Sequence, residues 1–175
     1  MYIHYRISRR LNWKDKQGWT ALHLAARAGH SEICALLIAN DEDVTLASDS
    51  GATAMHEAAG RGNADIVLAL QAAGADVDAA CETGTPLHWA AGDGSSDAVA
   101  KLVDLGASVE ATNSQGLTPL LLAAASQSPK CASFLIRGGA DCGFVLSGGL
   151  TVMHILAETG QVRSLLPLGV WPHAS

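Results

Sequence analysis

GTPLHWAAGDGS, residues 84–95, has close copies elsewhere in the chain, and this repetition limits what the chain can fold into. The copies are GWTALHLAARAGH from Gly18, GATAMHEAAGRGN from Gly51, GLTPLLLAAASQS from Gly116 and GLTVMHILAETGQ from Gly149. Their leading glycines are spaced by 33, 33, 32 and 33 residues. A fixed period of roughly 20 to 50 residues indicates a solenoid of stacked units.

Each copy carries the signals of a turn followed by a short helix. A polar turn closed by glycine comes first, and a threonine then occupies the position of a helix N-cap. In two copies a proline, Pro86 or Pro119, takes the first helical position, where its missing N–H has no helical partner. Apolar residues follow at helical spacing, as at Leu22, Ala25 and Ala26. The pattern predicts a first helix in every unit.

A second helix is predicted after each first one. Its apolar positions in the first unit are Ile33, Leu36 and Leu37, and the same spacing recurs in later units. Alanine pairs such as Ala90-Ala91 keep the first helices thin, so stacked units can approach closely and the array can curve. We therefore expect a core of small and aliphatic side chains.

The motif Thr-Pro-Leu-His-x-Ala at residues 85–90, with the period of about 33 residues, resembles the ankyrin repeat. The resemblance covers residues 15 to about 161. It implies an all-α ankyrin-repeat solenoid of stacked helix-turn-helix units with short β-turn or hairpin tips. It also implies a non-enzymatic protein–protein interaction scaffold. The rival interpretation is an ankyrin fragment of a larger multidomain regulatory or targeting protein whose activity lies outside this chain.

The period divides the chain into five units with an extension at each end. Residues 1–14 are expected to be a basic N-terminal arm or the remnant of a preceding repeat, because Arg6, Arg9, Arg10 and Lys14 lie there. Repeats 1 to 4 are expected at residues 15–47, 48–80, 81–112 and 113–145. Residues 146–175 would form a divergent, incomplete repeat 5 and a tail, because Pro167 interrupts its second helix.

Composition argues against several classes of protein. The formal charge of −6 argues against a generic nucleic-acid binder, because such binding depends on basic groups. No window approaches the roughly 18 apolar residues of a membrane span, and the first residues lack the apolar core of a secretory signal. We expect an intracellular protein, cytoplasmic or nuclear. Its partner would be a protein, with no nucleic acid, membrane span, cofactor or small-molecule substrate.

Four histidines recur in register, which raises the alternative of a metal site. Equivalent residues on stacked helices lie on the order of 8–10 Å apart, whereas two ligands of one zinc ion lie within about 4 Å of each other. Each of these histidines follows a threonine by three residues, which favours a local hydrogen bond that braces the helix start. The predicted structural motif residues are Thr20, His23, Thr53, His56, Thr85, His88, Thr118, Thr151 and His154.

A metal- or thiol-dependent enzyme is the remote alternative. Cys34 and Cys131 fall on the predicted buried stripe of a second helix and are expected to be small hydrophobic residues. Cys81 and Cys142 lie nearer turns and are better candidates for an exposed thiol, but nothing nearby supplies an obvious activating base. No G-x-S-x-G, P-loop or H-E-x-x-H motif occurs. We predict no catalytic residue, no metal and no enzymatic activity.

Candidate partner-binding residues lie at the turn tips and on the exposed side of the first helices, where partners of ankyrin repeats commonly dock. Trp19 and Trp89 come first, because interfacial tryptophans and arginines often dominate binding energy. The alternative is that either tryptophan packs against a neighbouring repeat. Apolar residues flanked by acidic ones would suit a partner segment with apolar anchors and basic flanks. The predicted set is Trp19, Arg27, Glu57, Arg61, Trp89, Asp93, Leu117, Leu122 and Glu158.

Overall fold

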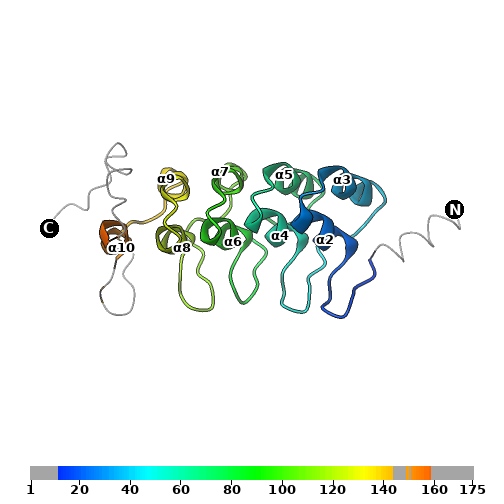
Figure 1. Cartoon of the computed structure of the whole chain (residues 1–175), viewed down its shortest axis with the longest axis horizontal. Helices are drawn as coiled ribbons and strands as arrows, with labels where there is room; N and C mark the ends of the chain where they lie inside the picture. Colours follow the sequence, from blue (N-terminus) through cyan, green and yellow to red (C-terminus); the bar gives the residue numbers. More distant parts are fainter. Residues whose placement is uncertain (1–11, 144–148, 150, 159–175) are drawn as a thin grey trace, which may run out of the picture.

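The computed structural model describes residues 12–143, 149 and 151–158 of the chain, and within them two rows of helices run side by side (Figure 1). The inner row consists of α2 (Ala21–Ala28), α4 (Ala54–Gly60), α6 (Pro86–Gly92), α8 (Pro119–Ala125) and α10 (Val152–Glu158). The outer row consists of α3 (Ser31–Ala39), α5 (Ala64–Ala72), α7 (Ser96–Asp104) and α9 (Pro129–Arg137). The predicted all-α solenoid is confirmed.

The loops that lead into α2, α4, α6 and α8 project beyond the inner row (Figure 1). Backbone hydrogen bonds close their tips, such as Asp15 N–H to the Trp19 carbonyl at 2.9 Å and Asn113 N–H to the Leu117 carbonyl at 3.1 Å. We call the surface formed by these tips and the exposed side of the inner helices the inner face.

A threonine caps each of the first three inner helices, and a histidine three residues later completes the cap. The backbone N–H groups of Thr20, Thr53 and Thr85 donate to the Nδ1 atoms of the paired histidines at 3.2, 3.1 and 3.0 Å. His154 binds Thr151 in the same way at an exposed position. In α8, Leu121 replaces the histidine, and its own N–H donates to the Thr118 hydroxyl at 3.4 Å. These contacts satisfy donors that the helix itself leaves free.

The same histidines also join neighbouring units, which the sequence pattern did not predict. The Nε2 atoms of His23, His56 and His88 lie 3.1, 3.1 and 3.0 Å from the carbonyl oxygens of Ala52, Gly84 and Leu117 in the next tip. Because Nδ1 accepts a backbone N–H, Nε2 carries the proton and donates it to the carbonyl. Each ring is therefore a hydrogen-bonded link between two repeats.

The core runs the length of the stack between the two rows. Alanines on α4 and α6, including Ala58, Ala59, Ala90 and Ala91, are fully buried. Their small side chains let α4 pack directly against α2 on one side and α6 on the other. Larger aliphatic side chains from both rows, such as Leu70, fill the space between the inner and outer helices.

The predicted apolar stripe on the first outer helix, α3, is partly wrong. Ile33 and Leu36 are 46% and 63% exposed, whereas Cys34 and Leu37 are buried. The two stripes differ by one residue, or roughly 100° around a helix. Packing of α3 against α2 and α5 selects the Cys34–Leu37 side, so the predicted burial of Cys34 and Leu37 is confirmed and that of Ile33 and Leu36 is wrong.

The third tip is one residue shorter than its neighbours, and Gly84 adapts to the deletion. Gly84 directly precedes Thr85, so its carbonyl accepts the proton of His56, as the Ala52 carbonyl accepts that of His23 and the Leu117 carbonyl that of His88. Its φ is 118°, compared with 73° at the equivalent Gly116. A Cβ at Gly84 would lie 2.5 Å from Cγ of His88, whereas one at Gly116 would meet no atom within 4 Å.

We expect Gly84→Ala to lower the free energy of unfolding by about 2 kcal/mol, through the glycine-only backbone and the contact with His88. Gly116→Ala is the matched control, because it has a positive φ but open space, and it should cost about 1 kcal/mol. Urea unfolding followed by circular dichroism measures both values. Equal losses in the two variants would contradict the assigned role of the His88 contact.

Candidate functional site

A depression of about 380 Å³ lies on the inner face where α2, α4 and α6 meet. We call it the central pocket. Six of the residues predicted for partner binding line it together, although they come from three different repeats. The lining residues are Trp19, Arg27, Glu57, Gly60, Arg61, Trp89 and Asp93.

Trp19 and Arg27 form one wall of the central pocket. Trp19 lies in the first tip, and Arg27 follows two turns later on α2. The guanidinium carbon of Arg27 is 5.0 Å from the centre of the Trp19 ring system, a cation–π distance. Trp19 is half-buried and Arg27 is exposed, so the pair offers a broad flat surface to solvent.

Trp89 forms the opposite wall and is held by contacts on two sides. Its indole N–H donates to the Thr83 hydroxyl at 2.9 Å. Its ring packs in an edge-to-face arrangement with the His56 imidazole, at a centroid distance of 5.4 Å and an interplanar angle of 68°. Trp89 therefore packs against a neighbouring repeat and also lines the pocket, so the two interpretations of this residue are compatible.

Gly60 of α4 has no side chain, which lets Trp89 and Asp93 lie close to this helix. The sequence pattern did not predict this role. A Cβ at Gly60 would lie 3.2 Å from Oδ2 of Asp93 and 3.4 Å from Cε3 of Trp89. The equivalent Gly92 on α6 has no neighbour within 4 Å of such a Cβ. The missing side chain at Gly60 thus helps to keep the pocket open.

Glu57 lies at the base of the central pocket and is only 6% exposed. Sequence analysis placed it on the exposed side of α4, and this expectation was wrong. The flanking repeats contribute to the same pocket, since Arg27 comes from the preceding unit and Trp89 from the following one. Burial raises the pKa of Glu57, against the opposing effect of the positive charges of Arg27 and Arg61.

A second, smaller depression of about 280 Å³ adjoins the central pocket along Trp19 and Arg27. Asp15, Gln17 and Leu24 complete its lining. Leu24 is 51% exposed and occupies the position on α2 that Glu57 occupies on α4. The inner face therefore continues from the central pocket toward the first tip with a partly apolar surface.

The three remaining predicted residues lie away from the central pocket. Leu117 and Leu122 are half-buried and pack against the core, although each keeps part of its surface exposed. The Leu117 carbonyl also accepts the proton of His88. Glu158 ends α10, and its side chain lies outside the described residues.

The four cysteines differ in burial. All four are unpaired, and Cys34 and Cys131 are buried. Burial raises the pKa values of the Cys34, Cys131 and Cys142 thiols, which disfavours the nucleophilic thiolate. Within residues 12–143, 149 and 151–158, no group of three or more His, Cys, Asp or Glu side chains is arranged to hold a metal ion.

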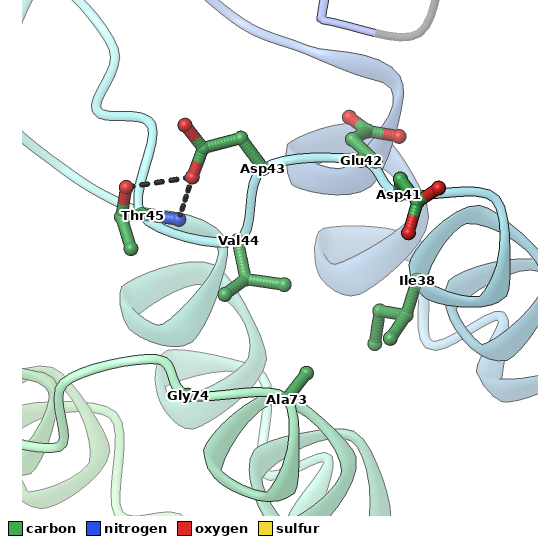
Figure 2. A pocket seen from close by; sticks show the side chains of 8 residues that line it. All are labelled: Ile38, Asp41, Glu42, Asp43, Val44, Thr45, Ala73 and Gly74. Carbon is green, nitrogen blue, oxygen red and sulfur yellow. Dashed lines mark hydrogen bonds between the residues drawn. The ribbon is translucent and has the colours of Figure 1, made fainter. Parts of the chain in front are cut away.

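A further depression, of about 470 Å³, lies between the C-terminal ends of α3 and α5 and is also lined by residues 41–45 (Figure 2). Three acidic residues border it, but two of them are engaged elsewhere. Asp43 accepts from the N–H and the hydroxyl of Thr45 at 2.9 and 2.6 Å, as Figure 2 shows. Glu42 accepts from Leu22 N–H at 3.0 Å. The carboxylates do not converge on a ligand, so the central pocket is the better candidate site.

Comparison with known families agrees with the stacked fold. The family model described as ankyrin repeats (3 copies) matches residues 3–81 and residues 78–145. The chain belongs to the ankyrin-repeat family, whose repeats are generally protein–protein interaction modules. A comparison with curated proteins finds no match. Of the helices in the described part of the chain, none has the length and apolar character needed to cross a bilayer.

Proposed function

We propose that this chain is a non-enzymatic scaffold that binds a segment of a partner protein on its inner face. The central pocket is the observation that carries the proposal. Trp19 and Trp89 present large, partly exposed rings from separate repeats, and charged groups surround them. Such rings are the residue type that most often dominates interface energy. Membership of a family of interaction modules supports the same conclusion.

The partner segment would extend beyond the central pocket along the inner face. Leu24 and Leu122 flank the pocket on α2 and α8 and keep exposed apolar surface for an extended chain. Leu117 and Glu158 remain proposed contacts at the later repeats. A segment with apolar anchors and basic flanks would match the apolar rings and the acidic side chains of this face.

The free cysteines support a reducing setting for this interaction. None of the four forms a disulfide, and disulfides are rare where the cytosolic thiol buffer operates. We therefore propose that the chain acts in the cytoplasm or nucleus. The raised thiol pKa values support its being a binding protein rather than a thiol enzyme.

The double variant Trp19→Ala, Trp89→Ala is expected to lose its partners. Truncation of an interfacial tryptophan typically costs about 2 kcal/mol, so the retained amount of each partner should fall at least about tenfold. Pull-down from cell extract, quantified by mass spectrometry, measures the change. Trp13→Ala is the matched control, because Trp13 is 83% exposed and lies outside the central pocket.

The proposal requires that both variants keep the wild-type circular dichroism spectrum and unfold cooperatively. A folded double variant with an unchanged partner list would show that the central pocket is not the binding site. A folded wild-type chain that retains no partner from the relevant extract would count equally against the scaffold function.

A further inference from the structure

The Glu57 side chain is largely buried, and its carboxylate lines the central pocket. It is 6% exposed, yet among the described residues it has neither a hydrogen bond nor an ion pair. Its oxygens still reach the solvent of the central pocket, unlike Oε2 of Glu42, which is buried without a partner. No described residue occupies this acceptor, so it is open to a hydrogen-bond donor of a guest in the pocket.

The two nearby arginines do not supply such a donor. Arg27 lies over the Trp19 ring and is exposed, and Arg61 is also exposed at the rim of the central pocket. Their charges lower the pKa of Glu57 less than burial raises it. The carboxylate is thus within the electrostatic field of two cations but is not bound by either.

On the side of the central pocket away from Arg27 and Arg61, two further residues suit a positively charged guest. Asp93 is exposed on the α6 side, where the absent side chain of Gly60 leaves it close to α4. Trp89 offers a half-buried ring beside Glu57, and aromatic faces attract cations and pack against aliphatic chains. A side chain with a cationic head and a long apolar stem could therefore contact Glu57, Trp89 and Asp93 together.

We propose that the central pocket receives an arginine or lysine side chain of the partner segment. The cationic head donates charge-assisted hydrogen bonds to Glu57 and Asp93, and the methylene stem packs on Trp89. The inference rests on the proposed function and specifies the chemistry of its partner. An acidic guest would place a second negative charge beside the unpaired Glu57 carboxylate, which disfavours it.

Small capped amino acids test this preference directly. N-acetyl-arginine amide would be titrated into the ¹⁵N-labelled chain while the indole N–H signals of Trp19 and Trp89 are followed by NMR. N-acetyl-norleucine amide and N-acetyl-glutamate amide are the neutral and acidic probes. We expect a saturable shift of the Trp89 signal with the arginine probe alone. Equal or stronger shifts with either other probe, or none with the arginine probe, would overturn the proposal.

Glu57→Gln tests the assigned ligand, because it keeps the shape and removes the charge. We expect the affinity for N-acetyl-arginine amide to fall at least about tenfold while the fold is retained. Glu32→Gln, on the distant first turn of α3, is the control and should bind like the wild type. An unchanged affinity in Glu57→Gln would remove Glu57 from the site.

Gly60→Ala tests the pocket without changing a charged group. Its new methyl group would press on Asp93 and Trp89 and should weaken binding of the arginine probe several-fold. Gly92→Ala adds the same group at the equivalent position of α6, where no atom lies within 4 Å, and should leave the affinity unchanged. Equal affinities in the two variants would contradict the proposed location.

The failure of this inference can be distinguished from the failure of the proposed function. If the arginine probe does not bind but partners are still lost from the double tryptophan variant, the scaffold function stands and the cationic guest is wrong. If partners are retained by that variant while the probe binds through Glu57, the pocket binds cations but does not mediate the partner interaction.

Discussion

Lowering the pH from 7 to 4 is expected to destabilise the folded stack by at least about 3 kcal/mol, because three buried histidines must stay neutral to keep their hydrogen bonds. Burial lowers the pKa values of His23, His56 and His88, and the pKa of His56 falls to about 4. A protonated Nδ1 could no longer accept the threonine N–H. The native state thus excludes protons that the unfolded chain binds.

The sign and the pH range follow from these shifts. Unfolded histidine titrates near 6.5, so the stability that depends on the neutral rings is complete above that pH. It is lost as the pH falls toward the native value of about 4 for His56. A shift of this size in one residue accounts for about 3 kcal/mol, and His23 and His88 add to it.

Glu57 acts in the opposite direction. Burial raises its pKa, so its protonation on acidification favours the folded state. Glu57→Gln removes this compensation, and its stability should fall more steeply with decreasing pH than that of the wild type. Near His23, the positive charge of Lys14 lowers the histidine pKa and the negative charge of Asp15 raises it, so both contribute to the native titration.

Urea unfolding at a series of pH values from 7 to 4 measures the loss, and NMR of the histidine rings assigns it. His56 should remain neutral at pH 5.5. Stability that is constant or increases between pH 6.5 and 4.5 would contradict the prediction. So would a His56 ring that titrates near 6.5 in the folded chain.

His56→Ala is expected to lower the free energy of unfolding by about 4 kcal/mol, the largest effect predicted for a single substitution. The substitution empties a fully buried site and leaves the Thr53 N–H and the Gly84 carbonyl without their partner. Cavity formation and orphaned buried groups each cost roughly 1–3 kcal/mol or more. It also removes the ring against which Trp89 packs.

Two control variants separate the contributions. His154→Ala breaks the same contact with Thr151 at an exposed position, so it should cost less than about 1 kcal/mol. His56→Leu reproduces the residue that α8 uses at this place, where Leu121 is 2% exposed. It should restore packing but not the hydrogen bond between repeats. Its loss of unfolding free energy should therefore lie between those of His56→Ala and His154→Ala. Chemical denaturation of all three variants measures these differences, and equal losses at His56 and His154 would contradict the assigned role.

The stability predictions and the proposed binding site are physically connected. His56 binds the third tip through the Gly84 carbonyl and packs in an edge-to-face arrangement with the Trp89 ring. The Trp89 indole N–H in turn donates a hydrogen bond to Thr83 of the same tip. A weakened His56 link should therefore loosen one wall of the central pocket before the stack unfolds.

The repeated sequence alone determined the architecture of this protein, because local chemistry recurs in every unit. Threonine caps, prolines at the first helical position and helical apolar spacing act within a few residues of one another, and this makes them readable without a structure. The same register predicted Trp19, Arg27, Arg61, Trp89 and Asp93 on one face, and the structure brings them around one depression.

Only the tertiary structure decided what depends on contacts between units. Helix spacing could not tell the Ile33–Leu36 stripe from the Cys34–Leu37 stripe, because the choice is made by the helices packed against α3. Glu57 occupies the same repeat position as the exposed Leu24, yet it is buried in a pocket that Arg27 and Trp89 of the adjoining repeats also line. Burial depends on neighbours about 30 residues away, which a pattern within one unit does not contain.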